Sequence, residues 1–487
     1  MDPVRLFSDT FGVDYSAAAY LVGALSSIPV AYLHRFIGPP ALRHVYAAVS
    51  GVLLSLISFT PDVLLHFILA AAFTLVVMRT QRSICGLVTF IGTFAHLIAC
   101  HVIFMSDDAR RTGRVDFTGT LTIVAIKLTS LAMDYQDGLK ALKDDAKRAK
   151  DGEKPESEQP SRDDRRKAEK RARVIREMPS LVEFLGYLFC CGQHLLGPWF
   201  DYQSYDDWTH RRGVWSPSVR SPSPIPPFLR VLVQGSLAAA VFLLIFPHLD
   251  LSLATDPARF FVLPFLRRLL LVFHATLVTR WRCYIVWSIA EAAMVAGGLG
   301  FSGWVAASGA ERQVASWDRA RNVNILGMEL ASTGADVAKN WNISFSTWLR
   351  IYVYERLEAM PRKSALFNLL FTFFISAISH GLNPGDLIGF AHWALMIAGS
   401  RVIYRWSRPL AQGSLPRRAA SLLHFLYVLL CINYAGFGFS VMTFQHTVQA
   451  YRGLYYYGTL VPVMLIVAGN FIRTPRPRGA KKSLKTE

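Results

Sequence analysis

The stretch Ile375–Phe390, ISAISHGLNPGDLIGF, joins two apolar runs through a short polar segment. The first run ends beside His380, and the second begins at Leu387. Between them lie glycine, asparagine and proline, the residue types that end helices. A broken helix within a membrane is tolerated only where protein or a water-lined cavity satisfies the freed backbone groups. The stretch therefore predicts two membrane helices with an ionisable, functional connection at His380.

The composition predicts an all-α polytopic membrane protein. The 487 residues are 52% hydrophobic and only 18% charged, and the mean hydropathy is +0.30. Because a bilayer core needs about 20 apolar residues per helix, the apolar blocks predict about eleven spans. The first block is expected to be a retained span, since the N-terminus lacks the basic segment of a cleaved signal peptide. The candidate spans are Ala17–Tyr32, Val45–Phe59, Val63–Met78, Ile84–Phe104, Leu121–Met133, Val231–Phe246, Phe260–Val278, Tyr284–Trp304, Ala365–Ile378, Leu387–Val402, Ala420–Val441 and Leu454–Ile472.

The net charge of +18 arises from 52 Lys and Arg against 34 Asp and Glu. In a membrane protein such an excess indicates cytosolic loops facing anionic lipid, and no nucleic-acid partner. The most charged stretch, Lys140 to Arg176, is expected to be a cytosolic loop. The predicted organisation is N-terminal helices (1–138), a charged loop (139–178), a catalytic core (179–472) and a basic tail (473–487).

Three groups of polar residues are unusual for an apolar chain. Several histidines lie in apolar blocks, where hydrogen-bonded packing explains most of them. Arg267 and Arg268 are costly in a membrane unless they face an anion or water. Lys339–Leu357 has an aromatic face and a polar face at helical spacing, which fits an interfacial helix or a cavity wall equally well. The six cysteines are expected to be buried free thiols, and no cluster with metal-ligand spacing is evident, so neither a metal nor a prosthetic group is expected.

Five blocks in order resemble the membrane-bound O-acyltransferase family, and within it the lysophospholipid acyltransferases. The resemblance covers most of the chain, from Thr118 to beyond Phe390. The blocks are TGTLTIVAIKLTSLAMDYQDG (Thr118–Gly138), PSLVEFLGYLFCCGQHLLGPWFDYQSY (Pro179–Tyr205), TRWRCYIVWSIAEA (Thr279–Ala292), WNISFSTWLRIYVYERL (Trp341–Leu357) and SAISHGLNPG (Ser376–Gly385).

The resemblance implies a helical bundle around an internal acyl-transfer chamber, with His380 and Asn342 as catalytic residues. Where the family commonly has tryptophan before the histidine, this chain has Ser379. Acyl-CoA is the implied co-substrate, the lysophospholipid is the implied acceptor, and the bilayer is the surrounding medium. Arginines at predicted helix ends would meet phosphates of CoA, and aromatic residues would line the acyl channel or headgroup site. The predicted substrate-binding residues are Trp341, Trp348, Arg350, Arg280, Arg282, Tyr284, Phe200, Asp201 and Tyr202.

The resulting prediction is a multi-pass enzyme of the endoplasmic reticulum membrane that acylates lysophospholipids in phospholipid remodelling. The acidic and aromatic blocks favour this acceptor over a sterol, a diacylglycerol or a peptide, which other branches of the same superfamily acylate. A different alternative is a proton-coupled transporter in which His380 relays protons, although no two-fold repeat of the spans is evident. A homo-oligomer remains open.

Overall fold

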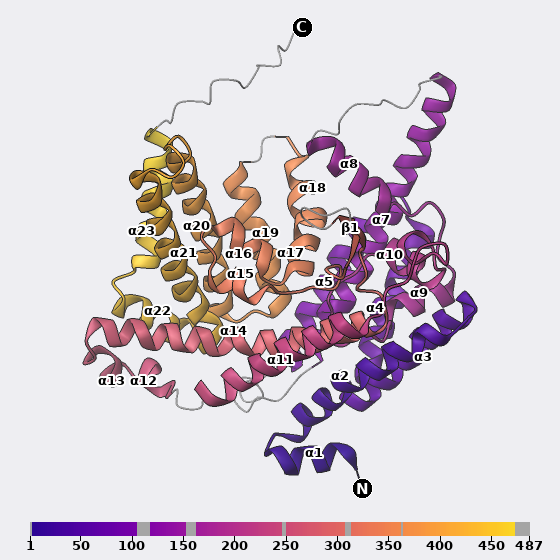
Figure 1. The fold of residues 1–487 in the computed structure, drawn as a ribbon, viewed down its shortest axis with the longest axis horizontal. Coiled ribbons are helices and arrows are strands. Elements are labelled where there is room, and N and C mark those ends of the chain that lie inside the picture. Colours follow the sequence, from indigo (N-terminus) through magenta and orange to yellow (C-terminus); the bar gives the residue numbers. More distant parts are fainter. Residues whose placement is uncertain are drawn as a thin grey trace. The chain divides into compact units, whose positions relative to one another are not determined.

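The computed structural model describes residues 2–104, 117–151, 162–245, 250–306, 313–361 and 364–472 (Figure 1). Most of these residues are helical. The strands that they form, β1 (Gly303–Ala306) and β2 (Gln313–Ser316), pair antiparallel with Gly303 opposite Ser316. The predicted all-α class is confirmed. The predicted basic tail, 473–487, lies outside the described residues.

Eight helices of the described chain are long and apolar enough to cross a membrane, so the polytopic prediction is confirmed. A bent pair, α22 (Phe444–Gly453) and α23 (Tyr457–Phe471), forms at most one further span, with a 75° bend between the two helices. The predicted number of eleven is not confirmed. The eight spans are α2 with the short helix η1 (Tyr15–Phe36), α3 (Pro40–Ser58), α4 (Val63–Thr80), α5 (Cys85–Phe104), α11 (Ile225–Ile245), α14 (Phe265–Ala296), α20 (Pro384–Ser407) and α21 (Leu415–Val441).

The chain divides into two compact units, which are described separately. Unit 1 comprises Met1–Ala239, Tyr284–Asn322 and Thr347–Val353, and unit 2 comprises Ala240–Cys283, Val323–Ser346 and Tyr354–Glu487. The remaining helices are α1 (Pro3–Phe11), α7 (Thr118–Asp151), α8 (Arg162–Arg173), α9 (Leu181–Leu188), α10 (Tyr202–Thr209), η2 (Gly213–Trp215), α12 (Ser252–Thr255), α13 (Pro257–Phe261), α15 (Ile325–Glu329), α16 (Gly334–Asn340), α17 (Ile343–Leu349), η3 (Arg350–Tyr354, a π-helical turn), α18 (Glu355–Glu358) and α19 (Ala365–His380).

Unit 1 is built around α7, which packs against α4 and α5, while α3 packs against α2 and α9. The α3–α9 contact depends on a residue without a side chain. A Cβ at Gly51 would lie 1.7 Å from the backbone oxygen of Phe189. Small residues let membrane helices approach closely, and this approach positions the segment that follows α9.

Unit 2 is built around α20, which packs against α19, α21 and α23. Gly385 in α20 and Gly438 in α21 face each other, and a Cβ at Gly438 would lie 2.2 Å from the backbone oxygen of Gly385. The Gly385 N–H also donates to the backbone oxygen of Met442 at 3.0 Å. The two glycines therefore hold the first turn of α20, just after His380, against α21.

We expect Gly438→Ala to lower the free energy of unfolding by about 1–3 kcal/mol, because the added methyl meets backbone that cannot rotate away. The measurement is the thermal unfolding midpoint of the purified protein in detergent. Gly119→Ala in α7 is the matched control, since no atom lies within 4 Å of the Cβ it would add. A midpoint for Gly438→Ala equal to that of this control would contradict the close packing of α20 and α21.

The prediction that Phe260–Val278 and Tyr284–Trp304 are two separate spans is wrong. Most of both belongs to the single 32-residue helix α14. The segment between them, TRWRC, is polar but contains no glycine or proline, so nothing in it breaks the backbone. Arg280 and Arg282 consequently lie in the middle of α14 and not at a helix end, whereas Arg267 and Arg268 lie in its first turn.

The predicted charged loop, 139–178, includes regular structure. α7 continues through its first residues to Asp151, and α8 covers Arg162–Arg173. Val174 and Ile175 after α8 are buried, and the Ile175 N–H donates to the backbone oxygen of Asp134 at 3.2 Å. The end of the loop is therefore anchored to α7, while residues 152–161 lie outside the described chain.

Candidate active site

The predicted break after His380 is confirmed in unit 2. α19 ends at His380, the next residue, Gly381, has φ 121°, and α20 begins at Pro384. Glycine adopts such a positive φ without the steric cost that other residues meet. The His380 side chain is exposed at this break. Behind it, the buried Asn383 amide donates to the buried Asp386 carboxylate at 2.8 Å, which stabilises the turn.

Aromatic rings fix the surroundings of the His380 imidazole. The Phe390 ring is stacked on it with centroids 5.3 Å apart, and the Phe345 ring meets it edge-on at 6.2 Å. Phe390 in turn contacts Phe439 at 4.8 Å and Trp393 at 6.2 Å. These rings restrict the tilt of the imidazole, so its nitrogens are held in a defined plane.

The predicted catalytic Asn342 lies between α16 and α17 with φ 41°, in the left-handed region. Asparagine tolerates this conformation better than most residues other than glycine. The Asn342 carbonyl accepts the Ser346 N–H at 2.8 Å, so the residue forms the start of α17. Phe345 is three residues further along this helix and contacts His380. The structure thus brings the segment that carries Asn342 to the candidate histidine.

The predicted substrate residues of unit 2 have different surroundings. The Trp341 ring packs against Trp393, with centroids 5.9 Å apart. Arg282 is exposed, and its guanidinium lies 5.6 Å from the centre of the Phe242 ring. Arg280 is 4% exposed and already bound to other protein groups.

Arg280 forms a bidentate ion pair with Glu329. Its Nε donates to Oε1 at 3.1 Å and its Nη2 to Oε2 at 2.9 Å, while Nη1 donates to Asn433 Oδ1 at 2.9 Å. A phosphate at Arg280 would have to displace this carboxylate. Sequence reasoning missed Glu329 and Asn433, although a lone glutamate in the apolar segment ILGMELA is a signal for a buried partner of an arginine.

Four of the six predicted substrate residues of unit 1 are buried. Trp348 is fully buried, and its indole N–H donates to the backbone oxygen of Ile126 at 2.9 Å. Asp201 caps α10 by accepting the Ser204 N–H at 2.9 Å. Phe200, Tyr202 and Tyr284 are buried. The Arg350 guanidinium, which is exposed, pairs with Glu169 of α8 at 3.2 Å.

A buried Tyr352–Asp134 pair links the first and fourth sequence blocks. The Tyr352 hydroxyl donates to Asp134 Oδ2 at 2.7 Å. The Tyr352 ring also contacts Trp199 at 5.7 Å and Trp348 at 5.8 Å. Within unit 1, three blocks that are far apart in sequence therefore meet at one tyrosine, which the sequence analysis did not select.

No metal is expected from the sequence because no cluster in it has metal-ligand spacing. In the fold, however, two groups of side chains among the described residues lie close enough together to hold a metal ion. In unit 1, Cys100 Sγ lies 3.6 Å from His66 Nδ1 and 3.9 Å from His96 Nε2. This group offers three donors, one fewer than a structural zinc site. The second group is His44, Glu183, Asp206 and His210, each of which already binds another protein group through at least one side-chain atom.

Comparison with known proteins agrees with these observations. The family model of the membrane-bound O-acyltransferases matches residues 102–442. The chain is 38% identical to lysophospholipid acyltransferase 1 of Arabidopsis thaliana over 96% of this chain and 98% of the relative. It is 36% identical to lysophospholipid acyltransferase 2 of the same plant over 97% of each chain. It is 26% identical to the lysophospholipid acyltransferase of Saccharomyces cerevisiae over 83% of this chain and 64% of the relative.

The matched residues, 102–442, include His380 at the break between α19 and α20, Asn342 at the start of α17 and the aromatic residues around the imidazole. The match also covers more than half of the chain, and two relatives extend it over nearly the full length. The chain belongs to the membrane-bound O-acyltransferase family.

Proposed function

We propose that this multi-pass membrane enzyme transfers a fatty acyl group from acyl-CoA to the free hydroxyl of a lysophospholipid, with His380 as the general base. The observation that carries the assignment of His380 is the break after α19, where an exposed imidazole is held by two aromatic rings. The acceptor class is supported by the three relatives, each named as a lysophospholipid acyltransferase.

The proposed reaction requires one group that accepts a proton and one group that donates a hydrogen bond to the oxyanion. An imidazole nitrogen of His380 removes the proton from the lysophospholipid hydroxyl as its oxygen attacks the thioester carbonyl carbon. The resulting oxyanion collapses, the carbon–sulfur bond breaks, and the CoA sulfur takes the proton. The products are a phospholipid and CoA, with no net change in protons or oxidation state. No metal or prosthetic group is needed for these steps.

Asn342 is assigned one of two roles, and both stay open. Its amide either orients the imidazole or hydroxyl, or donates to the developing oxyanion. In either role it acts from the left-handed turn at the start of α17, whose Phe345 packs against His380. We place this chemistry in the endoplasmic reticulum membrane, the location predicted from the sequence.

An acceptor competition tests the proposed function. The purified protein receives one acyl-CoA and equal amounts of lysophosphatidylcholine, lysophosphatidylethanolamine, lysophosphatidylserine, cholesterol and diacylglycerol. We expect acylated lysophospholipids, identified by mass spectrometry, and little acylation of the two phosphate-free acceptors. Preferred acylation of cholesterol or diacylglycerol would move the chain to another branch of the family.

A further inference from the structure

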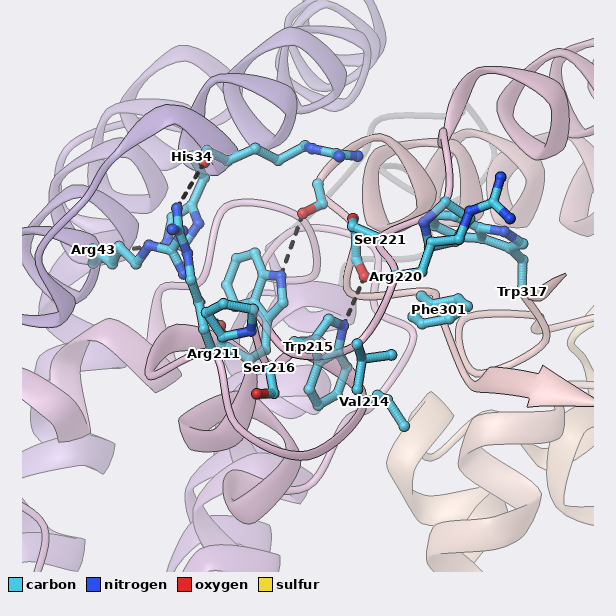
Figure 2. Close-up of a pocket in the computed structure, with 17 residues that line it drawn as sticks. His34, Arg43, Arg211, Val214, Trp215, Ser216, Arg220, Ser221, Phe301 and Trp317 are labelled. Carbon is cyan, nitrogen blue, oxygen red and sulfur yellow. Dashed lines mark hydrogen bonds between the residues drawn. The ribbon is translucent and has the colours of Figure 1, made fainter.

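A pocket of about 380 Å³ lies in unit 1, and none of the predicted catalytic residues lines it. It opens between the end of α2, the start of α3, the end of α10 and the segment that follows α14. Figure 2 shows His34 and Arg43 on one side of it and Phe301 and Trp317 on the other. The turn at its base is fixed by two indoles, because Trp208 Nε1 donates to the Gly297 oxygen at 3.3 Å and Trp215 Nε1 to the Gly298 oxygen at 2.9 Å.

The polar lining of the pocket is cationic. Four arginines, Arg35, Arg43, Arg211 and Arg220, contribute to it, and no lining residue is an aspartate or glutamate. None of the four forms an ion pair within the described residues. Arg43 is buried and Arg35 is half-buried, and charges in such positions are costly without a counter-charge, so the pocket is suited to an anion.

The hydrogen bonds of these arginines leave their charge uncompensated. Arg43, 4% exposed, donates to the backbone oxygens of Ile37 at 2.7 Å and Thr209 at 3.1 Å. Arg211 Nη2 donates to the backbone oxygen of Arg35 at 3.3 Å. Arg35 Nη1 is buried and has no hydrogen-bond partner among the described residues. A ligand oxygen at this nitrogen would satisfy a donor that the protein leaves unpaired.

Aromatic rings form part of the remaining lining, beside serine, proline, valine and glycine residues. Trp208 stacks on His34 with centroids 4.0 Å apart, and Phe301 contacts Trp317 at 5.3 Å. Since the indole N–H groups of Trp208 and Trp215 are bound to backbone oxygens, these rings offer a ligand only apolar surface. The combination of guanidinium groups and rings suits a phosphate ester, whose oxygens match the guanidinium fork and whose organic part packs on the rings.

The connections of the first spans indicate which side of the membrane the pocket faces. The α2–α3 connection carries Arg35, and the α4–α5 connection carries Arg82. Because two spans separate them, both connections lie on the same side. Arg82 Nη2 donates to the backbone oxygen of Arg176 at 2.7 Å, which places this side with the end of the charged stretch that we expect to be cytosolic. Two sources of phosphate esters are available there: the headgroups of anionic phospholipids in that leaflet and soluble nucleotides.

We propose that this pocket is a phosphate-ester binding site distinct from the acyl-transfer residues, with Arg35, Arg211 and Arg220 as the phosphate ligands. Its lining belongs wholly to unit 1, whereas His380 and Asn342 belong to unit 2. The inference does not depend on the proposed function, and it is tested by binding without any measurement of acyl transfer.

The test measures the Kd of the purified full-length protein in detergent for two phosphate esters and their phosphate-free counterparts. The lipid pair is dioctanoyl phosphatidic acid and dioctanoylglycerol, and the soluble pair is adenosine 3′,5′-bisphosphate and adenosine. The variants are Arg35→Gln and the double variant Arg211→Gln/Arg220→Gln. Arg408→Gln, an exposed arginine of unit 2, is the control for loss of charge.

We expect at least one phosphate ester to bind more tightly than its phosphate-free counterpart, and its Kd to rise about tenfold or more in both pocket variants but not in Arg408→Gln. If phosphatidic acid binds and its binding depends on the arginines, the ligand is a lipid headgroup of the membrane. If the bisphosphate binds in this way, the ligand is a soluble nucleotide. Arg211 and Arg220 are exposed, so the double variant is expected to fold even in the case that Arg35→Gln does not. Equal Kd values for folded pocket variants, control and wild type, or no preference for a phosphate, would overturn the proposal.

Discussion

Replacing His380 with alanine will lower the turnover of acyl transfer by about 10²–10⁴-fold, the usual contribution of a positioned general base. The physical reason is that no other group on the break between α19 and α20 can take the hydroxyl proton near neutral pH. The neighbouring acid, Asp386, is buried and accepts a hydrogen bond from Asn383. The measurement is the initial rate of phospholipid formation from acyl-CoA and lysophosphatidylcholine by the purified variant.

The fold should survive this substitution. His380 is the exposed last residue of α19, so its removal leaves no cavity in the core. We expect the thermal unfolding midpoint to stay near that of the wild type. His446→Ala is the matched control, because this imidazole contacts Thr443 at the start of α22 and belongs to the same unit. Its activity should remain near wild type, and a His380→Ala protein that retained a similar rate would show that another group is the base.

The largest expected effect on stability belongs to Arg280→Met. Removing the guanidinium takes three hydrogen bonds away from the Glu329 carboxylate and the Asn433 amide oxygen in unit 2. Arg280 is buried, but the Glu329 side chain is 22% exposed, so the loss is expected to lie below the roughly 3–5 kcal/mol of a fully buried pair. We therefore expect a marked fall in the unfolding midpoint in detergent. Arg282→Met, an exposed position on the same helix, should change the free energy of unfolding by no more than about 0.5 kcal/mol.

The double variant Arg280→Met/Glu329→Gln separates stability from substrate binding. It also removes the negative charge of Glu329, which Arg280 no longer balances, so part of the lost stability should return. If Arg280→Met instead keeps wild-type stability and raises only the KM for acyl-CoA, the guanidinium serves CoA phosphate, as the sequence alone predicted.

Local signals in the sequence were sufficient to predict the break at His380. Gly381 and Pro384 require a particular backbone, and this requirement does not depend on distant residues. The polar segment TRWRC also predicts a break, and this prediction is wrong, because Arg280 and Arg282 fit within the continuous helix α14. A polar side chain within a helix needs polar partners around it but leaves the helical backbone intact, whereas glycine and proline alter the backbone conformation and its hydrogen bonds.

The partners of buried charges could not be predicted in this way. Glu329 lies 49 residues and Asn433 lies 153 residues from Arg280 in the sequence, and only the fold brings them together. The cationic pocket is a similar case. Arg211 donates to the backbone oxygen of Arg35, which lies 176 residues earlier in the sequence, and each of the two segments alone resembles an ordinary basic connection.

The most direct test of the central claim is the stoichiometry of one reaction. Purified protein is mixed with acyl-CoA and lysophosphatidylcholine, and the free CoA thiol and the new phospholipid are quantified in the same samples. Acyl transfer predicts one thiol for each phospholipid, no thiol release above background without the acceptor, and loss of both products in His380→Ala. Thiol release that does not depend on the lysophospholipid, or equal product formation by His380→Ala, would contradict the account.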